Sequence, residues 1–301
     1  MAVTAQAGPV AAIGNFDGVH LGHQYLIAET VKLAAEAGAP AGVIVFEPHP
    51  RRFFRPQDPP FLLTTSPERT RLLKSYGASE IFTLIFDEAM AALTPEAFVR
   101  SVLHEQLGLS GVVTGTEFQF GRARAGDVTM LADLCADVGI AAHRVTPMTN
   151  EGAPEKIGSS VVRAALQEGD VRRAEALLGR RWSVEGVVAP GQKLGRTIGF
   201  PTANITLGDL VEPRYGVYAV MITVDGVDTP GVANFGRRPT VGAPAPLLEA
   251  HLFDFDGDLY GKTIRVAFAD FIRAERKFDG IDGLKAQIAR DCETARRLLA
   301  A

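Results

Sequence analysis

Short apolar runs alternate with longer segments of helical periodicity over the first half of the chain. The apolar runs predict strands at residues 10–13, 41–46, 81–86, 111–115 and 141–145. Helices are predicted between them at residues 22–38, from a Ser66 N-cap with Pro67 in the first turn, from Thr94, and at residues 128–138. Because strands that alternate with helices form parallel sheets covered on both faces, this half predicts an α/β domain.

From about Trp182 the pattern changes, and strand-like runs follow one another without long helices between them. Turn residues such as Asp225-Gly226 and Asp256-Gly257 separate these runs, which favours an antiparallel barrel or sandwich. Two short helices joined at Gly169-Asp170 are expected between the halves. A final helix is predicted to pack on the barrel through one apolar face, made of Ile281, Leu284, Ile288, Cys292, Ala295 and Leu299.

The composition is that of a soluble globular protein, with 301 residues of which 47% are hydrophobic and 22% charged. This length favours two domains, with one large α/β domain as the alternative, and the net charge of −4 argues against a general nucleic-acid binder. Cys135 and Cys292 have no partner at metal-ligand spacing, so neither a zinc site nor a disulfide framework is expected. With no apolar run near about 18 residues and no secretory signal pattern, we expect no membrane segment and a cytoplasmic location.

The most informative segment is GNFDGVHLGHQ, residues 14–24, where the first predicted strand passes into the first helix. Gly14, Gly18 and Gly22 permit close approach of a ligand to the backbone, and a helix start attracts phosphate. His20 and His23 are three residues apart, so both imidazoles can reach one anion there and stabilise charge on a phosphoryl group. Two unrelated histidines on a glycine-rich turn would show the same spacing, but the strand–loop–helix context favours a phosphate site.

A second phosphate clamp is predicted in IGSSVVR, residues 157–163. Hydroxyl groups of Ser159 and Ser160 at a helix start, with Arg163 one turn later, provide donors for an anion. Taken alone, the segment is equally compatible with two serines that cap a helix.

The segment GQKLGRTIGFPTANI, residues 191–205, is rich in glycine but lacks the spacing of a P-loop and runs into a strand. It predicts a flap containing Gly191, Gly195 and Gly199. Thr202 and Asn204 are two residues apart, so on an extended chain both point the same way and offer oxygens to Mg²⁺ or phosphate. A Gly/Pro turn with a capping threonine is the alternative.

Glu249 and His251 share one face of the predicted strand LLEAHLF, with apolar residues on the other face. A carboxylate on a barrel strand can serve as a general base toward a substrate hydroxyl. A solvated glutamate would fit the same pattern.

Read together, these segments resemble a known family over residues 10–298. GNFDGVHLGHQ, FEPHP, GTEFQFGRARAGD and IGSSVVR resemble, in that order, the FMN adenylyltransferase half of the bacterial bifunctional riboflavin kinase/FAD synthetases. GRTIGFPTANI, GVYAV, GVANFGRRPTV, LLEAHLFDFDGDLYGK and RAERKFDGIDGLKAQIARD resemble the riboflavin kinase half. The resemblance implies a Rossmann-like nucleotidyltransferase domain at 1–180, and a riboflavin kinase β-barrel with a closing C-terminal helix at 181–301.

The resemblance also implies two ATP-dependent steps and the residues that perform them. The barrel phosphorylates riboflavin to FMN, and the first domain adenylylates FMN to FAD with release of pyrophosphate. In the first domain, His20, His23 and Arg163 are implied to be catalytic. The implied ATP site there comprises Gly14, Asn15, Phe16, Asp17, Gly18, His20, His23, Glu117, Ser159, Ser160 and Arg163.

For the kinase, the implied base is Glu249, which also borders the flavin with Arg273 and Phe278. The implied ATP site comprises Gly191, Lys193, Gly195, Arg196, Gly199, Phe200, Pro201, Thr202 and Asn204, and the last two also hold Mg²⁺. The implied partners are the small molecules riboflavin, FMN and ATP, with no nucleic acid, membrane or dedicated protein partner.

All departures from the family pattern fall in the first domain. Gly158 and Ser160 replace a serine and a threonine of the second clamp, Glu117 stands where aspartate is usual, and Arg52 where an acidic residue is common. We expect both activities, and a riboflavin kinase with a degenerate adenylyltransferase domain is the alternative. The barrel motifs argue against a different adenylyltransferase, and the intact candidate catalytic residues argue against a non-catalytic flavin-binding protein.

Overall fold

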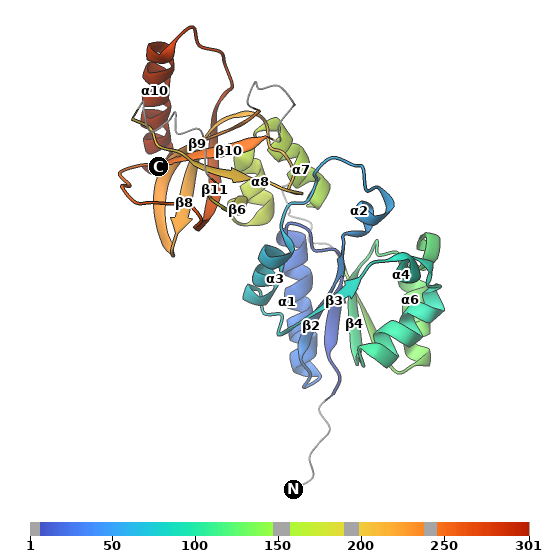
Figure 1. Ribbon diagram of the computed structural model, residues 1–301. Coiled ribbons are helices and arrows are strands. Elements are labelled where there is room, and N and C mark those ends of the chain that lie inside the picture. Colours follow the sequence, from blue (N-terminus) through green and yellow to red (C-terminus); the bar gives the residue numbers. More distant parts are fainter. Residues whose placement is uncertain (1–6, 147–156, 190–198, 238–245, 301) are drawn as a thin grey trace. The chain divides into compact units, whose positions relative to one another are not determined.

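The computed structural model describes residues 7–146, 157–189, 199–237 and 246–300 (Figure 1). The chain forms two compact units: Met1–Pro59 with Thr64–Ile157, and Pro60–Leu63 with Gly158–Ala301. The helices that follow Gly158 therefore pack with the second unit. The boundary near residue 180 between the catalytic domains remains a prediction.

The first unit is built on a five-stranded parallel sheet in the order β3-β2-β1-β4-β5. Its strands are β1 (Val10–Ile13), β2 (Ala41–Glu47), β3 (Glu80–Ile85), β4 (Gly111–Gly115) and β5 (Ala141–Val145). All four residues of β1 are buried. Val10 and Ala12 pack into one hydrophobic cluster and Ala11 and Ile13 into another. The sheet is thus covered on both faces, which confirms the predicted α/β class.

The helices of this unit follow the predicted alternation and add several short ones. They are α1 (Leu21–Glu36), α2 (Pro50–Phe54), α3 (Ser66–Ser75), α4 (Glu88–Ala92), α5 (Pro95–Ala97), the π-helix η1 (Phe98–Gln106), the 3₁₀ turn η2 (Arg122–Arg124) and α6 (Val128–Asp137). The prediction of Ser66 as the N-cap of α3 was wrong. The Thr65 hydroxyl accepts the N–H of Glu68 at 3.4 Å, so Thr65 is the cap and Ser66 the first helical residue.

The second unit contains a six-stranded antiparallel sheet in the order β6-β11-β8-β9-β10-β7. Its strands are β6 (Ser183–Val187), β7 (Ala203–Thr206), β8 (Gly216–Val224), β9 (Val227–Gly236), β10 (Leu247–Leu252) and β11 (Thr263–Ala274). A bridge between Ala189 and Asn204 joins the two ends of this order, so the sheet closes into a barrel. The predicted barrel class is confirmed.

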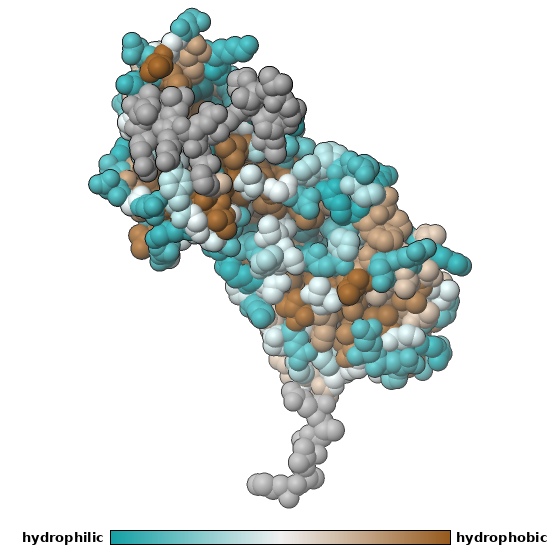
Figure 2. All heavy atoms as spheres, viewed as in Figure 1, coloured by the Kyte–Doolittle hydropathy of each residue, from teal (hydrophilic) through white to brown (hydrophobic). Residues whose placement is uncertain are grey.

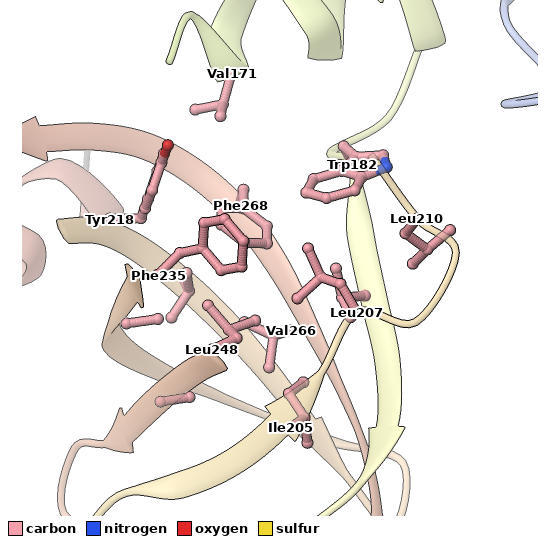
Figure 3. Packing of buried hydrophobic residues seen from close by; sticks show 14 of the residues in the cluster. Val171, Trp182, Ile205, Leu207, Leu210, Tyr218, Phe235, Leu248, Val266 and Phe268 are labelled. Carbon is pink, nitrogen blue, oxygen red and sulfur yellow. The ribbon is translucent and has the colours of Figure 1, made fainter. Parts of the chain in front are cut away.

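Aromatic and aliphatic side chains fill the barrel, as Figure 3 shows for Trp182, Phe235, Leu248 and Phe268. The Trp182 and Phe268 ring centroids are 5.0 Å apart. Helices α7 (Ser159–Glu168) and α8 (Val171–Leu178) contribute to the same core. They are joined as predicted at Gly169, whose φ of 83° suits glycine.

The closing helix α10 (Ile281–Ala300) packs on β8, β9 and β11. Ala295 is buried, and Cys292 and Leu299 pack beside it, as predicted. The prediction was wrong for Ile281, which is 57% exposed. The polar residues Gln287 and Asp291 are buried on this helix instead, because arginines pair with them. Within the described ranges, no helix has the length and apolar character needed to span a bilayer.

Candidate active sites

The loop between β1 and α1 adopts a strained conformation. Phe16 and Val19 have φ angles of 50° and 40°, although both carry side chains that disfavour positive φ. Both side chains are fully buried, so the surrounding packing holds the backbone in place. Such strain persists only where neighbouring structure over-determines it, and it is common at ligand-binding loops.

Buried polar contacts hold this loop from a second segment of the chain. The Asp17 carboxylate, 2% exposed, accepts the backbone N–H of Thr64 at 3.2 Å and lies 3.5 Å from its hydroxyl. The Thr64 hydroxyl oxygen in turn accepts the N–H of Gly18 at 3.1 Å. The buried Arg69 guanidinium donates to the carbonyl of Asn15 at 3.2 Å and pairs with Glu47 on β2. Sequence analysis missed Thr64 and Arg69, because neither belongs to a motif.

His20 and His23 lie together at the N-terminus of α1. The Nδ1 atom of His20 accepts the backbone N–H of His23 at 3.3 Å and caps the helix. Because Nδ1 is an acceptor, the proton of the neutral ring sits on Nε2, which is then a donor. The two rings stack with their centroids 3.6 Å apart. Burial, and secondarily the nearby His20, lower the pKa of His23 well below its usual value, so His23 is neutral at pH 7.

A cavity of about 1050 Å³ opens beside this loop. It contains Gly14, Asn15 and Glu117, so three residues predicted at the nucleotide line one space. Its other lining is largely aromatic and cationic, with Phe46, Phe54, Phe86, Phe98, Phe118, Phe120, Arg51, Arg55 and Arg124. We call it the aromatic cavity. Sequence analysis missed most of this lining, since its residues come from separate loops.

The aromatic rings of this cavity support one another. The Phe86 centroid lies 5.7 Å from that of Phe46 and 5.7 Å from that of Phe54. Phe54 remains 64% exposed despite these contacts. On the face shown in Figure 2, brown hydrophobic residues lie among teal polar ones over this unit. An exposed ring held by other rings is suited to stack on a planar ligand.

The second predicted clamp begins helix α7 in the other unit. The alternative, in which serine side chains cap this helix, was wrong. Gly158 is the N-cap, no side chain caps the helix, and Ser159 and Ser160 lie in its first turn. Arg163 donates from Nε to the carbonyl of Phe61 at 2.6 Å. His20 and His23 belong to the first unit, whereas Ser159, Ser160 and Arg163 belong to the second. A phosphate clamp formed by the histidines together with these residues remains a prediction.

A cavity of about 320 Å³ in the barrel unit brings together residues from distant motifs. Phe200, Thr202, Glu249, Arg273 and Phe278, all predicted site residues, line it. We call it the barrel cavity. The predicted residues Gly191, Lys193, Gly195 and Arg196 lie outside the described residues.

Strand register places two amides beside the candidate base. Glu249 on β10 lies directly opposite Asn204 on β7 and Asn234 on β9, so the three side chains share one face of the sheet. Asn204 is buried, and Asn234 lines the barrel cavity. Sequence analysis missed Asn234. The strand alternates as predicted, with Leu248 and Ala250 buried on the opposite face.

Phe200 and Pro201, which precede β7, contact His251 on strand β10. The carbonyl of Pro201 lies 2.8 Å from Nδ1 of His251 and can only accept, so Nδ1 carries the proton. The Phe200 ring packs edge-on against His251 with centroids 5.5 Å apart. Gly199, just before them, has a φ of 89°. These contacts hold the described end of the predicted flap against β10.

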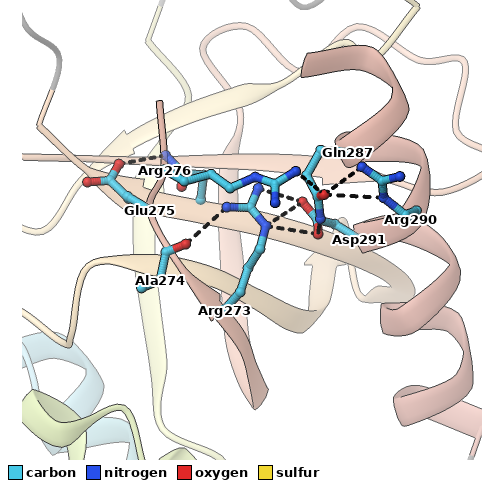
Figure 4. A network of polar contacts seen from close by, with 8 residues as sticks. Arg273, Ala274, Glu275, Arg276, Gln287, Arg290 and Asp291 are labelled. Carbon is cyan, nitrogen blue, oxygen red and sulfur yellow. Dashed lines mark hydrogen bonds and ion pairs between the residues drawn. The ribbon is translucent and has the colours of Figure 1, made fainter. Parts of the chain in front are cut away.

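A polar network joins the barrel cavity to α10 (Figure 4). Arg273 binds the Asp291 carboxylate through Nε at 3.0 Å and Nη2 at 2.7 Å. Gln287 donates to the same carboxylate at 2.7 Å and accepts from Arg276 and Arg290. The Arg276 guanidinium also lies 4.7 Å from the Phe278 ring centroid. Helix α10 therefore positions the cations that border the cavity.

We expect Asp291→Asn to destabilise the barrel unit by about 3 kcal/mol, because Arg273 would keep a largely buried charge without its partner. Asp291 is 3% exposed. Urea unfolding followed by fluorescence of Trp182, the sole tryptophan, measures the loss. Asp254→Asn is the matched control, since it breaks the ion pair between Asp254 and Arg296 on the exposed side of α10. Equal midpoints for the two variants would contradict the prediction.

Comparisons with known proteins cover both units. The family described as FAD synthetase matches residues 3–161, and the family described as riboflavin kinase matches residues 178–299. The "Bifunctional riboflavin kinase/FMN adenylyltransferase" of Escherichia coli K12 is 40% identical over 97% of this chain and 93% of its own length. That of Bacillus subtilis is 38% identical over 97% and 93%.

One solved structure is also similar over the full length. It is a Streptococcus pneumoniae protein described as a macrolide-efflux protein, with a TM-score of 0.87 and 31% identity. The match covers 98% of this chain and 96% of that one.

Fold, sites and matches together define a two-domain transferase that combines a nucleotidyltransferase unit with a kinase barrel. Both a FAD synthetase domain and a riboflavin kinase domain are present. The chain belongs to the bifunctional riboflavin kinase/FMN adenylyltransferase family, which confirms the resemblance drawn from its motifs.

Proposed function

We propose that this chain phosphorylates riboflavin to FMN in the barrel unit and adenylylates FMN to FAD in the α/β unit, using one ATP in each step. The observation that carries this proposal is the convergence of Thr202, Glu249, Arg273 and Phe278 on one cavity, from three separate segments. The α/β unit has its own candidate site at His20 and His23, at the start of α1. Two sites with different chemistry match two successive reactions.

In the kinase step, a Glu249 carboxylate oxygen accepts the proton of the ribityl 5′-hydroxyl. The ribityl 5′ oxygen then bonds to the γ-phosphorus of ATP, while the bond between the γ-phosphorus and the β-phosphate oxygen breaks and ADP leaves. Thr202 and Asn204 bind the ATP phosphates, and Arg273 and Phe278 border the flavin. Positioning supplies much of the rate in such transfers, which suits a cavity held by strand register.

The donors around Glu249 fit a magnesium ion. A threonine hydroxyl, an asparagine amide and a carboxylate are hard oxygen ligands, and Mg²⁺ is held by one or two such groups together with phosphates. Thr202 and Asn204 would hold it. When bound, it neutralises charge on the transferred phosphoryl group.

In the adenylyl step, a phosphate oxygen of FMN attacks the α-phosphorus of ATP and pyrophosphate leaves. The Nε2–H of His20 and the positive end of the α1 dipole stabilise the negative charge that develops there. Ser159, Ser160 and Arg163 bind the triphosphate. The aromatic cavity takes the flavin rings of FMN, and Arg51, Arg55 and Arg124 attract its phosphate.

The test is incubation with riboflavin, ATP and Mg²⁺, followed by chromatographic separation of the flavins. We expect both FMN and FAD. FMN alone would support the kinase with a degenerate adenylyltransferase, to which Gly158 and Glu117 would then point. Neither product would overturn the proposal. Supplying FMN and ATP directly tests the second step by itself.

The remaining expectations accompany this function. We propose ATP and Mg²⁺ as co-substrate and metal, and riboflavin and FMN as the flavin partners. A cytoplasmic location and the absence of a dedicated protein partner remain predictions.

A further inference from the structure

A four-residue segment of the first half of the chain, Pro60–Leu63, packs within the barrel unit. The Phe61 and Leu62 N–H groups donate to the carbonyl of Asp209 at 3.1 and 3.0 Å, and the Leu62 carbonyl accepts from Val211 at 2.7 Å. Phe61 and Leu63 are buried there. We call this segment the strap.

The end of the strap has its own anchor in the barrel core. The indole Nε1–H of Trp182 donates to the carbonyl of Leu63 at 2.9 Å, and Leu63 is fully buried. The Trp182 ring packs against the Phe268 ring. Leu63, the last residue of the strap, is therefore held by the hydrophobic core of the second unit.

The next residue, Thr64, makes its buried contacts in the other unit. Its N–H and hydroxyl engage Asp17, and its hydroxyl oxygen accepts the N–H of Gly18. The chain thus passes from the second unit to the first at the Leu63–Thr64 peptide bond. Thr64 thus binds the loop between β1 and α1 at a point between two residues with positive φ, Phe16 and Val19. A strained loop keeps its shape only while such contacts persist.

We propose that Thr64 is a positioning residue for adenylyl transfer, because its backbone N–H and its hydroxyl hold Asp17 and Gly18 of the loop between β1 and α1. This inference rests on the proposed function of the α/β unit. Thr64 acts through the loop, without touching substrate. Loss of its hydroxyl leaves a buried N–H of Gly18 without this acceptor and lets the loop relax away from the phosphate-binding shape.

The first test is Thr64→Val, which keeps the side-chain shape and removes the hydroxyl. We expect the KM for ATP in FAD formation from FMN to rise about tenfold. FMN formation from riboflavin should stay at the wild-type rate, because Thr64 lies outside the barrel unit. Thr64→Ser restores a hydroxyl and should recover most of the affinity. An unchanged KM in a folded Thr64→Val protein would overturn the inference.

The second variant is a control for general destabilisation. Phe268→Leu disturbs the barrel core, where Phe268 packs against Trp182, and should lower Tm while leaving the same KM unchanged.

Equal KM changes in Thr64→Val and Phe268→Leu would show general destabilisation and would contradict the role of Thr64. Failure of the wild-type protein to form FAD from FMN would instead reject the proposed function. The two failures are therefore distinguishable.

Discussion

Replacing Glu249 with glutamine should lower the rate of FMN formation from riboflavin by about 10²–10⁴-fold, the usual contribution of a general base. The amide keeps the size of the side chain and its place opposite Asn204 and Asn234, but it cannot accept the ribityl proton. FAD formation from added FMN should be unchanged. Chromatographic assay of each step with its own substrate measures both effects.

Glu185→Gln is the matched control for this variant. Glu185 also stands on a barrel strand, where its carboxylate pairs with Arg265 at 3.0 Å on the exposed surface. It removes one negative charge from the barrel unit, as Glu249→Gln does, without touching the cavity. If the two variants phosphorylated riboflavin equally well, Glu249 would not be the base.

Replacing His20 should abolish FAD formation while sparing FMN formation, with a loss of about 10²–10³-fold expected for one donor to a developing charge. His20 has two separable roles, because its Nδ1 caps α1 while its Nε2–H is the donor proposed for catalysis. His20→Ala removes both roles. His20→Asn keeps a good N-cap and removes the imidazole donor.

The two His20 variants therefore separate stability from catalysis. Only His20→Ala should lower the free energy of unfolding, by about 1 kcal/mol, whereas both should lose FAD formation. Thermal unfolding alongside the FMN-to-FAD assay gives the two quantities. Wild-type FAD formation by His20→Asn would mean that His20 serves the helix alone.

Local patterns predicted the architecture well. The strands at 10–13 and 111–115 were predicted with their observed bounds, because buried parallel strands are short continuous apolar runs set between helices. The period-2 alternation of LLEAHL placed Glu249 and His251 on one face, as observed. The helix cap at Ser66 was wrong, because propensity alone does not select between the adjacent polar residues Thr65 and Ser66.

Candidate site residues that are close in sequence could be predicted to act together, and those brought from other elements could not. His20 and His23 are three residues apart, so their stacking at the start of α1 follows from helix geometry. Thr64, Arg69 and Asn234 reach their sites from other elements. No local signal marks a threonine that will accept a loop N–H after the chain has folded. The burial of Asp291 was not predicted either, because the apolar periodicity of its helix gives no reason to bury a carboxylate.

The sequence by itself determined the two fold classes, their order along the chain and the short motifs that carry the chemistry. Those properties depend on neighbours within about ten residues, whose periodicity and spacing the chain encodes directly. The tertiary structure alone decided the aromatic cavity, the network around Asp291 and the contacts that hold Asp17 and Gly18 to Thr64. These depend on contacts between distant segments, which form only when burial brings complementary polar and apolar groups together.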